Sequence, residues 1–114
     1  MNQIQTFDFQ GYELRTVLIN NEPWFVAKDV CEILGLNTSE AVRGRKDRDF
    51  KDGLDLDEYR DDIDIVDTIG RRVKVIAVNE SGLYNLIFKS RKPEAKRFKR
   101  WVTHEVLPSI RKHG

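Results

Sequence analysis

Residues 79–113 read NESGLYNLIFKSRKPEAKRFKRWVTHEVLPSIRKH and predict two helices, one after the other. Asn79 is a favourable N-cap, because its side-chain oxygen can accept a hydrogen bond from a backbone N–H of the first turn. Leu83, Leu86 and Ile87 then recur at helical spacing and form one apolar stripe. The first helix is therefore expected to follow Asn79 and to pack on the rest of the protein through this stripe.

The second helix is longer and has two distinct faces. Ser90 is expected to cap it, and Pro93 fits near its first turn, where a missing N–H costs little. At about 100° per residue, the apolar face contains Phe98, Trp101, Val102 and Val106. The rest of its surface carries the cations Lys96, Arg97, Lys99 and Arg100. Pro108 is expected to stop or bend this helix.

The basic face of the second helix predicts contact with an anionic partner. Cations on a rigid face can meet phosphates along a DNA duplex and release counterions, so that binding weakens steeply with salt. The alternative is an exposed basic helix that only keeps the protein soluble. The rings of Phe98 and Trp101 are expected in the core rather than stacked on bases, because they share a face with Val102 and Val106.

Charge is distributed unevenly along the 114-residue chain, although its formal net charge is only +1. Residues 89–112 contain nine lysines and arginines against two glutamates, whereas residues 47–67 contain ten acids against three bases. Fields from such runs add over a Debye length of roughly 8 Å. The runs predict two surfaces of opposite charge, with two alternatives: both are merely solvated, or they neutralise each other in the fold.

The N-terminal part predicts three linked strands over residues 4–26. The alternating segment YELRTVLI follows a turn at residues 10–11, and a second turn at residues 20–23 leads into the apolar strand WFV at 24–26. Aromatic and β-branched residues in linked strands of this kind are typical of a small antiparallel sheet.

A pair of short helices is expected next. AKDVCEILGL, residues 27–36, predicts a helix that ends at Gly35, and a capping residue at 37–39 can begin the second helix. The pair resembles a helix-turn-helix, whose second helix would carry Arg43, Arg45 and Lys46. However, Gly44 stands where a larger apolar residue is expected, so simple packing of two helices on the sheet is the stronger interpretation.

The middle of the chain predicts a loop and a hairpin. Residues 47–62 have few apolar anchors and are expected to form an acidic loop, with one helical turn near residues 54–59. Residues 63–78 alternate on both sides of Gly70 and predict a β-hairpin. The expected fold is a single α+β domain over residues 1–114, in which a small antiparallel sheet with hairpins packs against about four helices.

Several classes of protein are not supported by the sequence. The lone cysteine, Cys31, excludes an internal disulfide and is expected to pack as a small hydrophobe, and His104 and His113 make no metal-finger pattern. Without a leader pattern or an apolar run of about 18 residues, the protein is expected to be soluble and cytoplasmic. No catalytic motif is present, so neither enzymatic activity nor a cofactor is expected. The enzymatic alternative is a nuclease that binds Mg²⁺ through carboxylates of residues 47–67.

Four ordered blocks of the sequence resemble the Bro-N domain. They are WFVAKDV at residues 24–30, LGL at 34–36, NESGLY at 79–84 and most of residues 90–111. Bro-N domains occur at the N-terminus of baculovirus repeated-open-reading-frame proteins and of bacteriophage antirepressors. The resemblance implies a compact α+β DNA-binding domain, typically followed by a variable C-terminal domain. It also implies a role in lifting lytic repression, by acting on DNA or on a repressor protein.

The expected function is that of a phage or prophage antirepressor-type regulator of transcription that binds double-stranded DNA without catalysis. Phosphate contacts are expected from Arg43, Arg45, Lys46, Lys92, Lys96, Lys99 and Arg100. The alternative is a protein-interaction module that binds and inactivates a phage repressor through its acidic 47–67 segment, which could mimic the charge spacing of phosphates. A homodimer is consistent with a DNA regulator, because dimers match paired half-sites.

Overall fold

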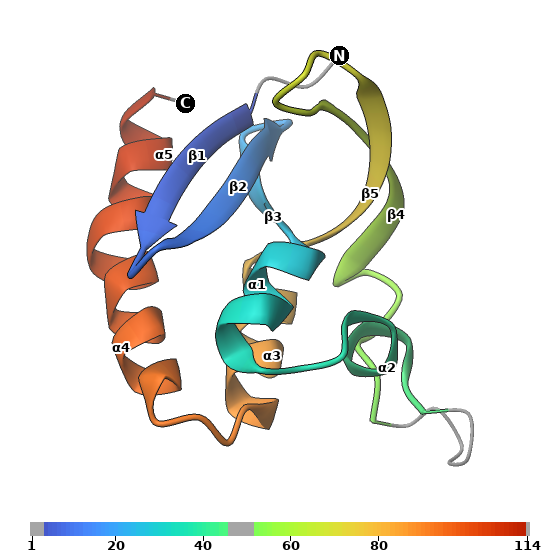
Figure 1. Ribbon diagram of the computed structural model, residues 1–114, viewed down its shortest axis with the longest axis vertical. Helices are drawn as coiled ribbons and strands as arrows, with labels where there is room; N and C mark the ends of the chain where they lie inside the picture. The colour runs from blue at the N-terminus through green and yellow to red at the C-terminus, as the bar shows by residue number, and fades with distance from the viewer. Residues whose placement is uncertain (1–3, 46–51, 114) are drawn as a thin grey trace.

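The computed structural model describes residues 4–45 and 52–113, with side chains described as far as Ile110. Within these residues the chain forms a five-stranded antiparallel sheet with the strand order β1-β2-β3-β5-β4, and helices pack against it (Figure 1). The strands are β1 (Ile4–Phe9), β2 (Tyr12–Ile19), β3 (Glu22–Val26), β4 (Tyr59–Val66) and β5 (Arg72–Val78). The helices are α1 (Ala27–Leu34), α2 (Thr38–Arg43), α3 (Glu80–Lys89), α4 (Glu94–Trp101), a π-helical turn (Val102–Val106) and α5 (Leu107–His113). The predicted α+β class is confirmed.

Strands β1, β2 and β3 follow one another through two-residue turns. Gln10 and Gly11 in the first turn, and Asn20 and Asn21 in the second, all have positive φ angles between 52° and 90°. Two consecutive residues of this kind fit the right-handed twist of neighbouring strands. The predicted meander over residues 4–26 is therefore confirmed.

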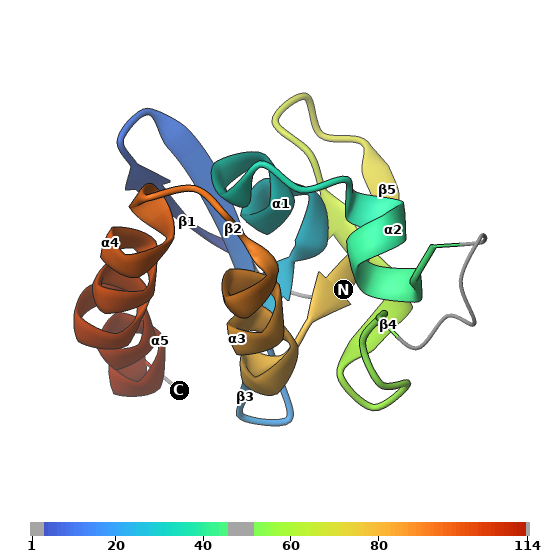
Figure 2. The same ribbon diagram turned by 90° about the horizontal axis from the view of Figure 1, so that it is seen from below.

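Both faces of the sheet bury apolar side chains. Successive residues of a strand point to opposite faces, so Phe25 packs with the helices, whereas Trp24 and Val26 belong to a second cluster. The other buried members of this second cluster are Val17, Ile63, Ile65 and Ala77. Figure 1 shows the strands curving around this interior, while Figure 2 shows the helices gathered on the other side. A strongly curved sheet thus supplies one of its two cores by itself.

Helices α1 and α2 begin and end close to their predicted positions. Gly35 adopts φ 70° at the C-cap of α1, and the side chain of Asn37 caps α2 by accepting the N–H of Glu40 at 3.0 Å. Gly44, with φ 87°, ends α2 after Arg43. The expectation that Arg45 lies on this helix is wrong, because a backbone with positive φ cannot continue a right-handed helix. Lys46 lies outside the described residues.

The acidic segment is more ordered than predicted. Strand β4 begins at Tyr59, so the last four residues of the expected 47–62 loop belong to the sheet. The N–H of Glu58 donates to the carbonyl of Asp55 at 2.9 Å, which makes a tight turn where a helical turn was expected. Residues 47–51 of that prediction lie outside the described residues.

The C-terminal helices differ from the prediction at both ends. The side chain of Asn79 caps α3 as expected, by accepting the N–H of Gly82 at 2.9 Å, but Pro93 rather than Ser90 stands at the N-cap of α4. Pro108 does not stop the helix. A π-helical turn precedes it, in which the N–H of Leu107 donates to the carbonyl of Val102. Wider turns of this kind offer room for a proline ring that would clash within a regular α-helix.

Candidate nucleic-acid interface

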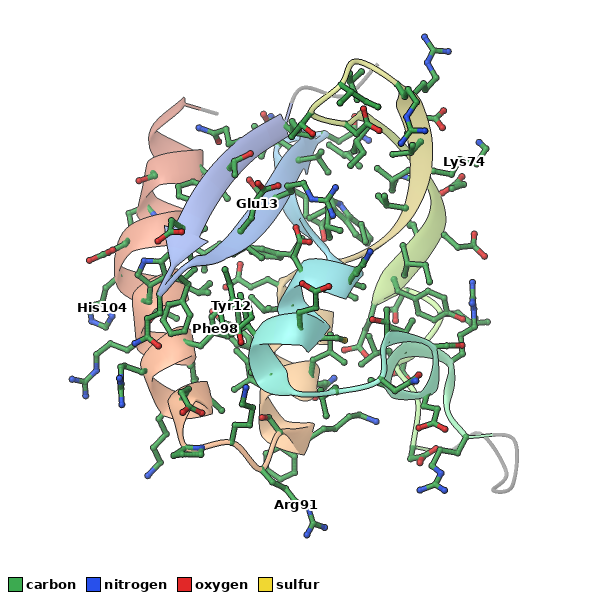
Figure 3. The ribbon with its side chains drawn as sticks, in the orientation of Figure 1. Tyr12, Glu13, Lys74, Arg91, Phe98 and His104 are labelled. Atoms are coloured by element: carbon green, nitrogen blue, oxygen red, sulfur yellow. The ribbon has the colours of Figure 1, made fainter. Side chains whose placement is uncertain are left out.

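Helix α4 separates an aromatic face from a basic face. Phe98 is fully buried, and its ring lies 5.3 Å from that of Phe9 and 5.9 Å from that of Trp101. Figure 3 shows Phe98 directed into the fold. These contacts confirm that Phe98 lies in the core and that the partly buried Trp101 packs against it, and they fix which face of the helix meets solvent.

Three cations gather on the solvent face of α4. Lys96, Arg97 and Arg100 are exposed and, together with Pro93, line a shallow depression of about 230 Å³. Residues three and four apart in a helix have Cβ atoms about 5–6 Å from each other. The three positive charges therefore lie close together. Across residues 4–45 and 52–110, no carboxylate lies within ion-pair distance of these three side chains. We call this set the α4 cation cluster.

Lys99 is exposed but turns towards α3. Its Nζ lies 5.9 Å from the ring centroid of Tyr84, at the limit of a cation–π contact. Lys99 is therefore adjacent to the α4 cation cluster without lining its depression.

Lys92 has a structural contact. Its Nζ donates to the carbonyl of Ile33 at 3.4 Å, and the hydroxyl of Ser90 donates to the carbonyl of Leu34 at 2.8 Å. Both carbonyls lie in the last turn of α1, where helical carbonyls lack intrahelical partners. The stem of Lys92 also covers Gly35, where a Cβ would approach its Cδ to 2.8 Å. The segment SRKP thus joins α4 to the end of α1, and a contact between Lys92 and DNA stays a prediction.

The other predicted cations lie near α2. Arg43 is exposed and forms a 3.5 Å ion pair with Asp61. Arg45 follows the helix, and its backbone N–H donates to Asp52 Oδ1 at 3.3 Å. Figure 1 shows α2 and the first turn of α4 along the same lower side of the molecule. The fold therefore places the predicted cations of α2 and the start of α4 on the same side of the molecule, with the end of α3 between them.

Most acids of the β4–β5 hairpin have cationic partners. Ion pairs join Arg60 to Asp62 at 3.2 Å, Arg71 to Asp67 at 3.1 Å and Lys74 to Asp64 at 3.4 Å. The side chain of Arg60 lowers the pKa of Asp62 by donating hydrogen bonds to it. The backbone N–H of Arg71 lowers the pKa of Asp67, with help from its guanidinium. Neighbouring cations thus offset much of the negative charge of this hairpin.

Glu58 is the buried acid among the described residues 52–67. Its side chain is 6% exposed and accepts hydrogen bonds from Ser81 Oγ at 2.5 Å, Asn85 Nδ2 at 2.7 Å and the N–H of Asp55 at 3.0 Å. Gly82 lies against the same residue, where a Cβ would approach the Glu58 carbonyl oxygen to 2.7 Å. The NESGLY block therefore attaches the acidic segment to α3.

A buried ion pair gives Asp29 of the WFVAKDV block a structural role. Asp29 is 6% exposed and accepts Arg15 Nε at 2.8 Å, Nη2 at 2.9 Å and the backbone N–H at 2.9 Å. These bonds raise the pKa of the Arg15 guanidinium above its ordinary value and hold α1 against β2. Cys31 on α1 is buried as expected, and burial raises the pKa of its thiol.

Sequence reasoning omitted Arg97 from the expected contact residues, although it belongs to the α4 cation cluster. The signal was available, because Arg97 and Arg100 are three residues apart on the helix. Arg91, which Figure 3 shows at the outer end of the molecule, was omitted as well.

The described residues, 4–45 and 52–113, contain neither a metal-binding cluster nor a membrane-spanning helix. In that part of the chain, no three carboxylate, histidine or cysteine side chains are placed to hold a metal ion. None of its helices is long and apolar enough to cross a membrane.

The curved antiparallel sheet and its layer of helices define a small α+β domain, in which α4 exposes a basic surface. The family described as "BRO family, N-terminal domain" matches residues 13–108, and the chain belongs to this Bro-N family. A Haemophilus influenzae protein of uncharacterized function is 41% identical over 99% of this chain and 53% of its own length. The Bro-N domain-containing protein 201R of invertebrate iridescent virus 6 is 35% identical over 96% of this chain and 29% of its own length.

The chain thus spans about half, or less, of the length of these relatives. A third relative, the Bro-N domain-containing protein 019R of invertebrate iridescent virus 3, is 32% identical over 96% of this chain and 30% of its own length. No solved structure matches the chain.

Proposed function

We propose that this domain is a non-enzymatic, antirepressor-type regulator of transcription that binds duplex DNA through helix α4. The observation that carries the proposal is the α4 cation cluster: Lys96, Arg97 and Arg100 are exposed, share a depression, and have no acidic partner among the described residues. Membership of the Bro-N family, whose phage members include antirepressors, supports DNA as the partner.

The α4 cation cluster is not explained by the stability of the helix. Lys96 and Arg100 are four residues apart, and like charges at this spacing destabilise a helix by a few tenths of a kcal/mol. Phosphates of a duplex would relieve this repulsion while releasing counterions. Such contacts position the domain on the duplex without reading its sequence.

Arg43 and Arg45 extend the proposed contact surface on the side of α2. The pair between Arg43 and Asp61 is exposed, with 45% and 62% of the two side chains accessible. Exposed pairs of this kind contribute about 0–1 kcal/mol, so Arg43 can exchange its carboxylate for a phosphate at little cost.

The experiment that tests the proposal is fluorescence anisotropy with a pool of labelled duplexes at several salt concentrations. A domain that meets six or more phosphates is expected to lose about 10³-fold or more in affinity between roughly 50 and 200 mM salt. Absence of binding at the lower concentration would overturn the proposal. Plasmid DNA kept with the protein and Mg²⁺ should stay intact, and cleavage that a chelator stops would contradict the non-enzymatic part.

A second candidate function is the capture of a repressor protein through strand β4. This strand forms an edge of the sheet, with Asp61 and Asp62 exposed on it, and an exposed edge can accept a strand from a partner. The Asp62→Asn variant should then fail to relieve repression in a reporter strain, while it binds the duplex pool as the parent does. A variant that relieves repression normally would argue against this candidate.

A further inference from the structure

Phe88 stands out among the side chains of α3. It is 90% exposed, although Leu86 and Ile87 beside it are buried. Single exposed hydrophobic residues are common on protein surfaces, so exposure alone does not indicate a site. The surroundings of Phe88 provide the second observation.

Phe88 lines an open groove of about 450 Å³ between α2 and the end of α3. The groove is open to solvent and is large enough for a single nucleobase. Leu36 and Ala41 contribute apolar surface, whereas Asn37, Glu40, Arg45, Asp52, Lys89 and Arg91 contribute polar and charged groups. An aromatic ring among cations is the arrangement with which proteins bind bases and their phosphates together.

The groove continues into the α4 cation cluster. Arg91 lines the groove and Pro93 lines the depression on α4, and two residues of chain span at most about 7 Å. Figure 3 shows Arg91 pointing outward at this junction. A nucleic-acid strand held by the depression can therefore reach the groove over a short basic path.

We propose that the groove binds one unstacked nucleobase of DNA on the ring of Phe88, with the adjoining phosphates at Arg91 and Lys89. The inference rests on the proposed DNA binding and adds a contact to it. Glu40 and Asp52 are hydrogen-bond acceptors in the groove, so a base with an exocyclic amine is preferred. The base comes from a single strand or from a duplex that is locally opened, and Phe88 stacks on it in the same way.

The test compares three labelled DNA probes by anisotropy at one salt concentration: a fully paired duplex, the same duplex with one bulged cytosine, and the corresponding single strand. The parent protein is expected to bind the bulged duplex more tightly than the paired one. Phe88→Ala should weaken binding to the bulged duplex by about 5- to 160-fold, which corresponds to the loss of one base–aromatic stack. Phe88→Tyr should stay within about twofold of the parent.

The salt slope separates stacking from charge. Phe88→Ala should leave the slope unchanged, whereas Arg91→Gln should reduce it by about 0.9. Leu56→Ala is the matched control, because Leu56 is 84% exposed in the acidic segment, and it should behave as the parent. Circular dichroism melting verifies that each variant is folded.

The outcomes separate the inference from the proposed function. If the parent binds DNA with a steep salt dependence but Phe88→Ala binds each of the three probes as tightly as the parent does, the base site is wrong and the proposed function stands. Weaker binding to the single strand and the bulged duplex alone supports a base that is already unpaired. Weaker binding to the paired duplex as well supports insertion into the helix. Failure of the parent to bind any probe overturns both.

Discussion

Helix α4 and the β4–β5 hairpin are both rich in charge, but they differ in whether their cations form ion pairs. In the hairpin, Arg60, Arg71 and Lys74 each lie within 3.1–3.4 Å of a carboxylate. In α4, Lys96, Arg97 and Arg100 have no such partner within residues 4–45 and 52–110. Figure 3 shows Lys74 of the hairpin far from Arg91, which lies on the connection between α3 and α4. The two regions therefore differ in how their charges are paired.

The difference follows from the local geometry of strands and helices. Asp64 and Lys74 are directly opposite each other in the β4–β5 register, and facing residues of neighbouring strands have Cβ atoms about 5 Å apart. Helix α4 has a single acid, Glu94, whose Oε2 is buried and has no hydrogen-bond partner in the described part of the chain. The exposed cations of α4 consequently have no carboxylate partner on their own helix.

The largest expected effect comes from removing the α4 cation cluster. The Lys96→Gln, Arg97→Gln, Arg100→Gln variant should lose about 2.7 from its salt slope, because each phosphate contact contributes about 0.9. On the same basis, its affinity for duplex DNA should fall roughly 500-fold at about 0.1 M salt. Anisotropy titrations at four or more salt concentrations measure both quantities.

The hairpin provides a control with the same change in net charge. The Arg60→Gln, Arg71→Gln, Lys74→Gln variant also removes three cations, but cations that are already paired. It should bind DNA within about threefold of the parent, because long-range fields are screened within roughly 8 Å. Equal losses in the two variants would show that net charge, and not the position of the α4 cation cluster, governs binding.

The next effect concerns stability and tests Glu58, the buried acid among the described residues 52–67. Glu58→Ala leaves the donors of Ser81, Asn85 and Asp55 without their shared acceptor. Loss of such buried bonds should lower the free energy of unfolding by about 2–3 kcal/mol, as measured by urea denaturation. Asp57→Asn, at an exposed neighbour, should leave the midpoint of the transition unchanged. If the two variants are equally stable, the segment is not anchored through Glu58.

A smaller effect should separate two cations of the same helix. Arg97→Gln removes one member of the α4 cation cluster and should weaken DNA binding about eightfold near 0.1 M salt. Lys99→Gln should weaken it about twofold, because Lys99 lies over Tyr84 and not at the depression. Anisotropy at a single salt concentration suffices. A larger loss for Lys99→Gln would place the DNA on the α3 side of the helix.

The smallest effect is a pH dependence of the hairpin. The backbone N–H of Arg71 lowers the pKa of Asp67 below 3.8 in the folded state, so the unfolded chain binds the proton more readily. The resulting stabilisation is present above pH 3.8 and is lost as the pH falls through the folded-state pKa. Asp67→Asn should therefore show less loss of thermal stability than the parent between about pH 4 and pH 2. Parallel curves would rule out this contribution.

Local sequence signals predicted much of the fold correctly. The turns at Gln10-Gly11 and Asn20-Asn21, the cap at Gly35 and the cap at Asn79 depend on conformations that these residues adopt by themselves or with near neighbours. The amphipathic pattern of α4 likewise placed Phe98 inside and its cations outside, since helical period and burial agree along this segment. Family membership also followed from the blocks that these elements contain.

The tertiary structure decided what the local signals left open. The sequence predicted that Ser90 caps a helix and that Lys92 is a free cation. Their side chains instead donate hydrogen bonds to the carbonyls of Leu34 and Ile33, more than fifty residues earlier in the chain. The acidic segment read as a loop, but Glu58 pairs with side chains 23 and 27 residues away.

The sequence by itself determined the class, the family and the basic helix, because these depend on residue types at short spacing. Contacts between segments distant in the chain decide the rest. They determine which charges are paired, which charges are structural, and that Phe88 borders a groove lined by cations. Such contacts exist only when the sheet and helices have packed, because chain entropy keeps these segments apart until burial of the core brings them together.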